Sequence, residues 1–343
     1  MREETGVPLS GLTSLRLGGP ARRLVVAETE NEVVSVVRSA DAAGEPLLVL
    51  GGGTNLVVAD EGFDGTVLRI ATRGVAPAAE TEHALQVEAG VDWDHVVALA
   101  VREGYAGIEA LSGIPGLVGA APIQNIGAYG QEVSQTIAEV RVLDRTTGDV
   151  VLLDNAACGF SYRHSVFKAS QRYVVLAVTY ALEHSHLGRP VAYAELARRL
   201  GVEVGDRVPS VDVRAAVLEL RRGKGMVLDP GDHDTWSAGS FFTNPVLSAA
   251  DAARLLPDDA PRWPDSGGRV KTSAAWLIEH SGFGKGYGSG RVRVSSKHPL
   301  ALTNRGGATT EELLAMAREL RAGVEARFGI ELVNEPVLVG VTL

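Results

Sequence analysis

Three short segments of this chain carry side chains that could act on a substrate. Arg163 lies among aromatic residues in FSYRHSVFK, Ser240 follows a glycine in AGSFFTNP, and Glu335 is the single charge in VNEPVLVG. A guanidinium can hold a carboxylate or phosphate, and a serine beside a suitable partner can react or donate a proton. Each residue alone also has an ordinary structural explanation: a surface ion pair, a turn, or protection of a sheet edge.

Two glycine-rich regions could bind a ligand through their backbone. LGGGTNLVVAD contains Gly51, Gly52 and Gly53, and GIEALSGIPGLVGAAPIQNIGAYG spans residues 107–130 with Glu109 as its only charge. An apolar, irregular segment needs partners for its peptide groups. A large polar ligand could provide them, although a tight turn is the alternative for either region alone. Neither region has the G-x-G-x-x-G or G-x-x-x-x-G-K-[ST] arrangement of the common nucleotide folds.

Composition argues against several classes of protein. The 343 residues suggest two or three domains. A net charge of -9 argues against general binding to nucleic acid or anionic membranes. The single cysteine, Cys158, rules out an internal disulfide, and neither a signal peptide nor a run of about 20 apolar residues is recognisable. The spacing of cysteine and histidine gives no metal site. We therefore expect a soluble cytoplasmic protein without a metal, nucleic-acid or membrane partner.

The pattern of apolar residues predicts an α+β mixture. Thr29 with Glu32, and Thr309 with Glu312, have the spacing of capping boxes. Segment 184–210 reads as a linker or excursion, GKGYGSG at 284–290 reads as a surface loop, and the chain ends in a strand interrupted at Pro336. Strands are expected at 24–27, 47–50, 67–70, 85–89, 140–143, 150–153 and 173–180, and helices between 29 and 44 and at 93–103, 211–222, 272–280 and 309–327.

Seven motifs together resemble one family, the UDP-N-acetylenolpyruvoylglucosamine reductases, in the longer type with a tyrosine loop. The motifs follow the family's order along nearly the whole chain: TSLRLGGPA, LGGGTNLVVAD, GIEALSGIPGLVGAAPIQNIGAYG, YRHSVFK, GSFFTNP, KTSAAWLIE and NEPVLVG. The resemblance implies an α+β fold, with a vanillyl-alcohol-oxidase/PCMH-type FAD-binding fold and a C-terminal α+β substrate-binding domain. The domains it implies are 1–70 with 328–343, 71–207, and 208–327.

The resemblance also implies non-covalent FAD, with NADPH as co-substrate. Glycines let backbone N–H groups approach phosphate oxygens closely, which suits an acidic protein. The residues that the resemblance assigns to FAD are Gly51, Gly52, Gly53, Thr54, Asn55, Leu56, Ser112, Gly113, Ile114, Pro115, Gly116, Gly119, Ala120, Gln124, Asn125, Gly127, Ala128, Tyr129 and Gly130.

In the family reaction, hydride passes from NADPH to FAD and then to C3 of the enolpyruvyl group of UDP-N-acetylglucosamine enolpyruvate. The product, UDP-N-acetylmuramate, is a precursor of peptidoglycan. Negative charge develops at C2, so the reaction needs charge stabilisation and a proton donor. By motif match, Arg163 and Glu335 stabilise the charge and Ser240 protonates C2. The substrate contacts implied are Tyr162, Tyr193, Arg221, Lys224 and Asn244.

The chain departs from the family pattern between Lys224 and Ser240, where it is longer than expected. This departure leaves the role of Lys224 open. His164 also stands where an acidic residue can follow the arginine. Two rival hypotheses are an FAD-dependent oxidase of an alcohol or lactone, and an FAD-binding protein without catalysis. Neither would need the Ser240 motif. We expect a monomer.

Overall fold

The structure is a computed structural model that describes residues 1–78, 83–168 and 170–343. By contacts along the chain it divides into two compact units. The first unit contains residues 1–7, 21–52 and 64–227, and the second contains residues 8–20, 53–63 and 228–343. The three-domain division implied by the resemblance has other boundaries, since 1–70 and 208–327 each contain residues of both units, and it stays a prediction.

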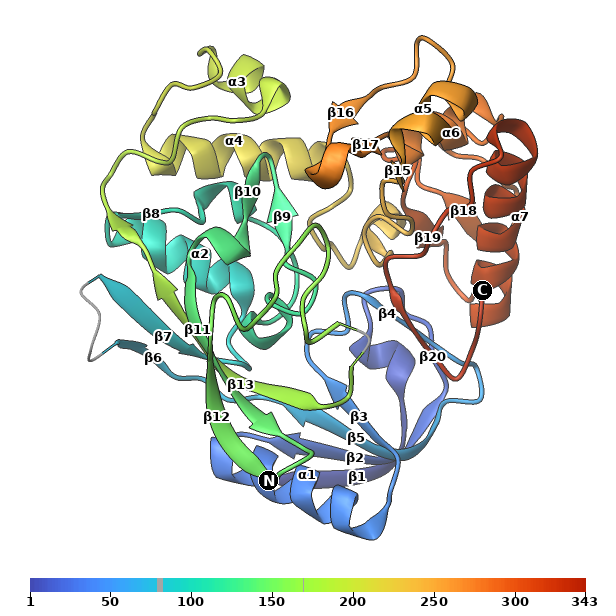
Figure 1. The fold of residues 1–343 in the computed structure, drawn as a ribbon. Coiled ribbons are helices and arrows are strands. Elements are labelled where there is room, and N and C mark those ends of the chain that lie inside the picture. The colour runs from blue at the N-terminus through green and yellow to red at the C-terminus, as the bar shows by residue number, and fades with distance from the viewer. Residues whose placement is uncertain (79–82, 169) are drawn as a thin grey trace. The chain divides into compact units, whose positions relative to one another are not determined.

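The first unit contains two main sheets. A four-stranded sheet has the order β1-β2-β5-β3, and a five-stranded sheet has the order β12-β11-β13-β7-β6 (Figure 1). β3 is parallel to β5, whereas β11 is antiparallel to β12 and β13. The expected β-α-β unit exists along the chain, but β5 separates its two strands. The strands are β1 (Arg2–Pro8), β2 (Pro20–Ala27), β3 (Leu47–Leu50), β5 (Phe63–Ile70), β6 (Val75–Pro77), β7 (Ala84–Glu88), β11 (Ile137–Asp144), β12 (Asp149–Asp154) and β13 (Tyr173–Ala181).

Helices α1 (Glu30–Ala43) and α2 (Trp93–Arg102) bury one face each in the core that both sheets share. The Thr29 hydroxyl accepts a hydrogen bond from the Glu32 N–H, which confirms the N-cap of α1. In a full capping box the Glu32 carboxylate would accept from the Thr29 N–H. Here it accepts instead from the N–H of the preceding residue, Glu28, at 2.8 Å. The helix ends at Gly44, whose φ of 63° is left-handed.

Segment 184–210 is a packed part of the first unit. It contains the end of β14 (Glu183–His184), which pairs with β8 (Tyr105–Ala106), and it contains α3 (Ala194–Leu200). Leu196 and Ala197 of α3 form a small core with α4 (Ser210–Gly223). Of the two expected alternatives, a linker or an excursion, the linker is therefore wrong, because the mostly polar segment contains a short helix with two buried residues.

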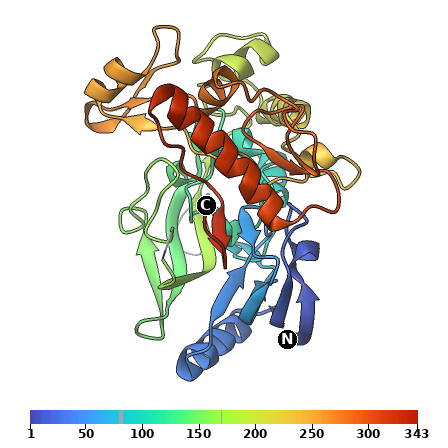
Figure 2. The same cartoon turned by 90° about the vertical axis from the view of Figure 1, so that its right-hand side faces the viewer.

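The second unit is built from short elements around a separate core. Its sheets have the orders β15-β17-β16, β18-β19 and β20-β4. The long helix α7 (Thr310–Phe328) packs against β18, β19 and α6 (Figure 2), and its expected capping box between Thr309 and Glu312 is confirmed. The other elements are α5 (Ala249–Leu255), α6 (Ala274–His280), β4 (Leu56–Val58), β15 (Val246–Leu247), β16 (Trp263–Pro264), β17 (Val270–Lys271), β18 (Val292–Val294), β19 (Leu302–Asn304) and β20 (Val337–Val339).

The terminal strand is shorter than the sequence suggested. β20 begins after Pro336 and pairs in parallel with β4, so the chain end returns to residues 56–58. The residues before Pro336 form no named strand; they contribute one isolated bridge, between Phe242 and Asn334. Glu335 is therefore half-buried in an irregular segment and does not interrupt a strand. Within residues 1–78, 83–168 and 170–343, no helix has the length and apolarity to cross a bilayer.

Candidate active site

Three motifs that lie far apart in the sequence meet in the second unit. The Glu335 N–H donates to the carbonyl of Phe241, the residue after Ser240, at an N–O distance of 2.8 Å. The Asn55 side chain donates to the Glu335 carbonyl at 3.4 Å, and the Asn55 carbonyl accepts from the Val337 N–H at 2.9 Å. The GSFFTNP, NEPVLVG and GGGTNL motifs are thus joined through their backbones. Ser240 and Glu335 occupy neighbouring chain segments.

The backbone around Ser240 is held on both sides. Besides the bond from Glu335, the Phe241 N–H donates to the Leu300 carbonyl at 2.7 Å, and the rings of Phe241 and Phe242 are buried in the core. Ser240 itself is half-buried. Its hydroxyl therefore sits on a fixed backbone that is still accessible to a ligand.

Asn244, an expected substrate contact, has a structural role within the chain. Its Oδ1 accepts a hydrogen bond from the Ala274 N–H at 3.0 Å, at the start of α6. The carboxamide also has two N–H groups that could face a ligand. The substrate role of Asn244 stays a prediction.

The three consecutive glycines have different explanations. A Cβ on Gly53 would lie 2.0 Å from the Leu12 carbonyl oxygen, and Gly53 has a φ of 62°. Its own chain therefore requires glycine there. A Cβ on Gly51 would meet nothing nearer than 3.9 Å. At Gly51 the fold leaves space beside the backbone, which is what close approach of a phosphate needs.

Glu109, the only charge of the second glycine region, is completely buried. Its carboxylate accepts from the N–H groups of Gly107 and Arg189, both at 2.6 Å, and from the Gln131 side chain at 2.8 Å. Gln131 in turn accepts from the Ala110 N–H at 2.9 Å. Buried charges in proteins are normally hydrogen-bonded in this way. Glu109 thus connects the second glycine region to Arg189, which precedes Tyr193 by four residues.

Backbone strain gathers at expected site residues. Among the residues that the structure describes, five non-glycine residues have a positive φ, and three of them are Asn125, Tyr129 and Arg163, with values of 46°, 49° and 52°. Left-handed conformations cost energy for residues with a Cβ and cluster at functional sites. The Asn125 side chain is occupied within the chain, since it donates to Glu132 at 2.8 Å and accepts from the Ser134 N–H at 3.0 Å.

Arg163 is tied to the second glycine region. Its guanidinium donates to the Gly127 carbonyl at 2.9 Å and to the Asn125 carbonyl at 3.4 Å, and it lies 5.3 Å from the centre of the Tyr162 ring. Lys168, at the end of the same motif, donates to the Arg163 carbonyl at 3.0 Å. The YRHSVFK motif therefore presents a cation at the edge of the glycine region. His164 is exposed.

The expected contacts Arg221, Lys224 and Tyr193 gather around Tyr129. The Lys224 ammonium lies 5.5 Å from the centre of the Tyr129 ring, and the Tyr193 ring packs edge-on against it at 5.7 Å. Lys224 is also paired with Glu195 at 2.5 Å. The role of Lys224, which the longer spacing before Ser240 left open, stays a prediction. Tyr129, which is expected to contact FAD, also lies beside expected substrate residues, and its FAD contact stays a prediction.

The charges in this cluster are matched to an anion. Burial lowers the pKa of Arg221 to about 10, so its guanidinium remains a cation at neutral pH. Its Nε is buried and has no hydrogen-bond partner among the described residues, while a second nitrogen donates to the Met226 carbonyl at 2.9 Å. Burial raises the pKa of Tyr129 to about 12, so its hydroxyl stays a donor. An unpartnered, buried donor in a native fold needs an explanation, and an anionic ligand provides one.

Sequence reasoning missed two ion pairs at this site. Glu195 follows Tyr193 by two residues, and an acid beside a substrate tyrosine was a signal that could have been noticed. Arg214 precedes Arg221 by two helical turns on the same face and binds Asp94 through two bonds, of 2.6 and 2.7 Å. Asp94 also accepts from the Gly113 N–H at 2.6 Å. This pair joins the helix that carries Arg221 to the glycine region.

The glycine regions fit a dinucleotide cofactor. They combine open space at Gly51, strained backbone at Asn125 and Tyr129, and an apolar sequence that provides peptide N–H donors. Backbone donors of this kind bind phosphate oxygens without needing lysine. Among residues 1–78, 83–168 and 170–343, no group of His, Cys, Asp and Glu side chains could hold a metal ion.

Known proteins match both parts of the chain. Residues 229–339 match the family model for the UDP-N-acetylenolpyruvoylglucosamine reductase C-terminal domain, and residues 21–154 match an FAD binding domain. A relative from Thermobifida fusca (strain YX), named UDP-N-acetylenolpyruvoylglucosamine reductase, is 58% identical and covers 98% of each chain. A relative of the same name from Streptomyces coelicolor is also 58% identical, over 100% of this chain and 92% of its own.

A solved structure supports the fold. The crystal structure of UDP-N-acetylenolpyruvylglucosamine reductase (MurB) from Thermus caldophilus has a TM-score of 0.69 at 26% identity and covers 99% of both chains. The FAD-binding fold and C-terminal domain expected from the motifs are confirmed. With relatives this similar over almost its entire length, the chain belongs to the UDP-N-acetylenolpyruvoylglucosamine reductase family.

Proposed function

We propose that Ser240, Glu335 and Arg163 carry the enolpyruvyl reduction that this chain, an FAD-dependent oxidoreductase of its family, performs with NADPH. The substrate is UDP-N-acetylglucosamine enolpyruvate and the product is UDP-N-acetylmuramate. FAD, when bound, supplies the two-electron chemistry, accepting hydride from NADPH and releasing it to the substrate. The observation that carries the proposal is the bond from the Glu335 N–H to the Phe241 carbonyl, which puts two chemically useful side chains on adjacent segments.

Ser240 is the proposed proton donor to C2. A serine hydroxyl is a weak acid in water, but an enolate carbon is a strong base, so a positioned hydroxyl is competent. The bonds at Phe241 fix the backbone immediately after Ser240, which meets the requirement for positioning.

Glu335 and Arg163 are the proposed partners of the charge that develops during the reaction. A guanidinium beside the substrate carboxylate stabilises the negative charge that spreads from C2, and Arg163 is oriented for this by the carbonyls of Gly127 and Asn125. Glu335 acts either in its protonated form or by orienting a donor. A pH profile of the Glu335→Gln variant separates these two roles, because glutamine can donate at any pH but cannot titrate.

The cluster around Tyr129 is the proposed site for the diphosphate of the UDP-sugar. Arg221 and Lys224 supply two cations, and the hydroxyl groups of Tyr129 and Tyr193 supply donors. The buried Arg221 Nε then gains an acceptor. Lys224 is paired with Glu195, so a diphosphate bound here has to share or replace this pair.

The wider biological setting follows from the product. We place the reaction in the cytoplasm, in peptidoglycan synthesis and cell wall biogenesis, and hence in the maintenance of cell shape, cell division and the cell cycle. A monomer without nucleic-acid or membrane partners suffices for this chemistry.

The test is NADPH oxidation by the purified protein, measured with and without UDP-N-acetylglucosamine enolpyruvate. We expect flavin bleaching by NADPH without oxygen, and turnover only when the UDP-sugar is present. If both substrates reach the same flavin face in turn, the kinetics are ping-pong, with inhibition by excess substrate. Turnover with oxygen and an alcohol, but not with the UDP-sugar, would establish the oxidase alternative, and intersecting double-reciprocal lines would require a ternary complex.

A further inference from the structure

The chain that precedes Ser240 forms an ordered loop in the second unit. We call residues 229–237 the 229–237 loop; it contains one turn of 3-10 helix, His233–Thr235. The Thr235 hydroxyl donates toward the carbonyls of Asp229 and Asp232, both at 2.8 Å, and accepts from the Asp229 N–H at 3.0 Å. The loop is therefore held together by hydrogen bonds among its own residues.

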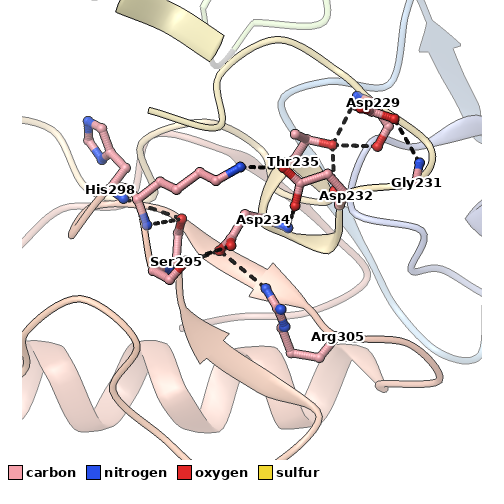
Figure 3. Close-up of polar contacts among 10 residues, drawn as sticks. Asp229, Gly231, Asp232, Asp234, Thr235, Ser295, His298 and Arg305 are labelled. Atoms are coloured by element: carbon pink, nitrogen blue, oxygen red, sulfur yellow. Dashed lines mark hydrogen bonds and ion pairs between the residues drawn. The ribbon is translucent and has the colours of Figure 1, made fainter. Parts of the chain in front are cut away.

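Asp234 is the point at which this loop is fixed to the rest of the unit. Its carboxylate accepts from the Ser296 N–H at 2.9 Å and from the Ser296 hydroxyl at 2.7 Å, and it lies 3.2 Å from the Arg305 guanidinium (Figure 3). Only 5% of Asp234 is exposed. A carboxylate withdrawn from water to this extent needs its partners, since removing one leaves an uncompensated charge.

Asp232 and Lys297 make a second contact between the same two loops, at 2.5 Å. Their side chains are about one-third exposed, so water and salt screen the pair and its contribution is small. Asp232 also accepts from the Asp234 N–H at 2.9 Å. This neighbouring pair connects the same loops with much less burial, and it provides an internal comparison for Asp234.

The chain between Asp234 and Ser240 is held at successive residues. The Trp236 carbonyl accepts from the Asn304 N–H at 3.0 Å, and the Ser237 carbonyl accepts from the Ser14 hydroxyl at 2.7 Å. Asn304 belongs to β19, and Arg305 follows it directly, so the partner of Asp234 and the partner of Trp236 are consecutive residues. Because Ser240 follows Asp234 by only six residues, the position of this strand end restricts where Ser240 can lie.

We propose that Asp234 is a positioning residue for Ser240: its buried bonds to Ser296 and Arg305 set the placement of the 229–237 loop and hence of the Ser240 hydroxyl. This inference rests on the proposed role of Ser240 as proton donor.

The test compares Asp234→Asn with the control Lys297→Met in stopped-flow measurements of both half-reactions. Asparagine keeps the size of the side chain and weakens the bond to Arg305. A displacement of about 1 Å at a reacting group can cost about 100-fold, so we expect Asp234→Asn to slow flavin reoxidation by the UDP-sugar about 10- to 100-fold. Flavin reduction by NADPH should stay within about twofold, and Lys297→Met should leave both rates near wild type.

A double-mutant cycle separates positioning from general destabilisation. If Asp234 acts through the Ser240 hydroxyl, Asp234→Asn should add almost nothing to the slowing already caused by Ser240→Ala, because the two residues share one function. Equal slowing of both half-reactions, or additive effects in the double variant, would overturn the inference. If Asp234→Asn does not fold, Arg305→Lys takes its place in the same cycle, with the same two criteria.

The same measurements separate a failure of the positioning role of Asp234 from a failure of the proton-donor role of Ser240. Normal reoxidation in Ser240→Ala would remove Ser240 from the mechanism, and the positioning role would go with it. Slow reoxidation in Ser240→Ala together with normal reoxidation in Asp234→Asn would refute only the positioning role.

Discussion

Removing the Ser240 hydroxyl should slow the second half-reaction, in which the UDP-sugar reoxidises the flavin, and leave the first half-reaction almost unchanged. The Phe241 backbone is bound by Glu335 and Leu300, and neither bond involves the Ser240 side chain. Ser240→Ala should therefore leave the segment in place. NADPH should still bleach the flavin at nearly the wild-type rate, because no proton has to reach C2 in that step.

The size of the effect follows from the exposure of Ser240. General acids contribute about 10²- to 10⁴-fold. Because Ser240 is half-buried, water can partly replace the missing hydroxyl, and we expect the lower part of that range. A loss of about 10²- to 10³-fold in reoxidation corresponds to ~3 to 4 kcal/mol in the barrier. The affinity for the UDP-sugar should change little, since the hydroxyl acts mainly in the transition state.

Stopped-flow flavin absorbance measures each step, and two further variants complete the design. Ser240→Cys keeps a proton of lower pKa at the same position and should recover part of the rate. Thr243→Ala removes a nearby hydroxyl that donates to the Val333 carbonyl at 3.3 Å, and it should leave both steps unchanged. Rapid reoxidation of Ser240→Ala by the UDP-sugar would refute the reasoning and leave GSFFTNP as a structural turn.

Other predictions concern cofactor, substrate and pH. Gly51→Val should lower the FAD content, measured after acid precipitation, because the new side chain fills the space beside the loop. The control Gly284→Val, in an open surface loop, should keep full FAD. Full FAD in both variants would mean that the three glycines form only a turn. Lys224→Met should raise KM for the UDP-sugar about tenfold with little change in kcat, and an unchanged KM would exclude the diphosphate role. Partial burial alone would raise the pKa of Asp94, but the bonds from Arg214 and Gly113 outweigh it and lower that pKa. The carboxylate therefore stabilises the fold above the unfolded-state pKa of about 4, and this stabilisation is lost as the pH falls through the lower folded-state pKa. Thermal unfolding followed at decreasing pH should show a loss that is smaller in Asp94→Asn, and identical pH profiles would contradict this.

The sequence alone determined the local elements and the family. The N-caps at Thr29 and Thr309 form as predicted because capping depends on residues three positions apart. The family was evident because seven motifs keep their order along the chain. The linker expected at 184–210 failed for a local reason too, because its polar composition hides the buried face of α3.

Only the tertiary structure decided which of these residues lie close together. A backbone bond from Glu335 to Phe241, the residue after Ser240, joins segments about a hundred residues apart, and no periodicity encodes that contact. Lys224 meets Glu195 and Tyr129 through the packing of α3 on α4, and the role of Asp234 depends on β19 lying beside its loop. Sequence patterns report neighbours along the chain, whereas charge pairing and burial depend on neighbours in space, which the whole packed fold determines.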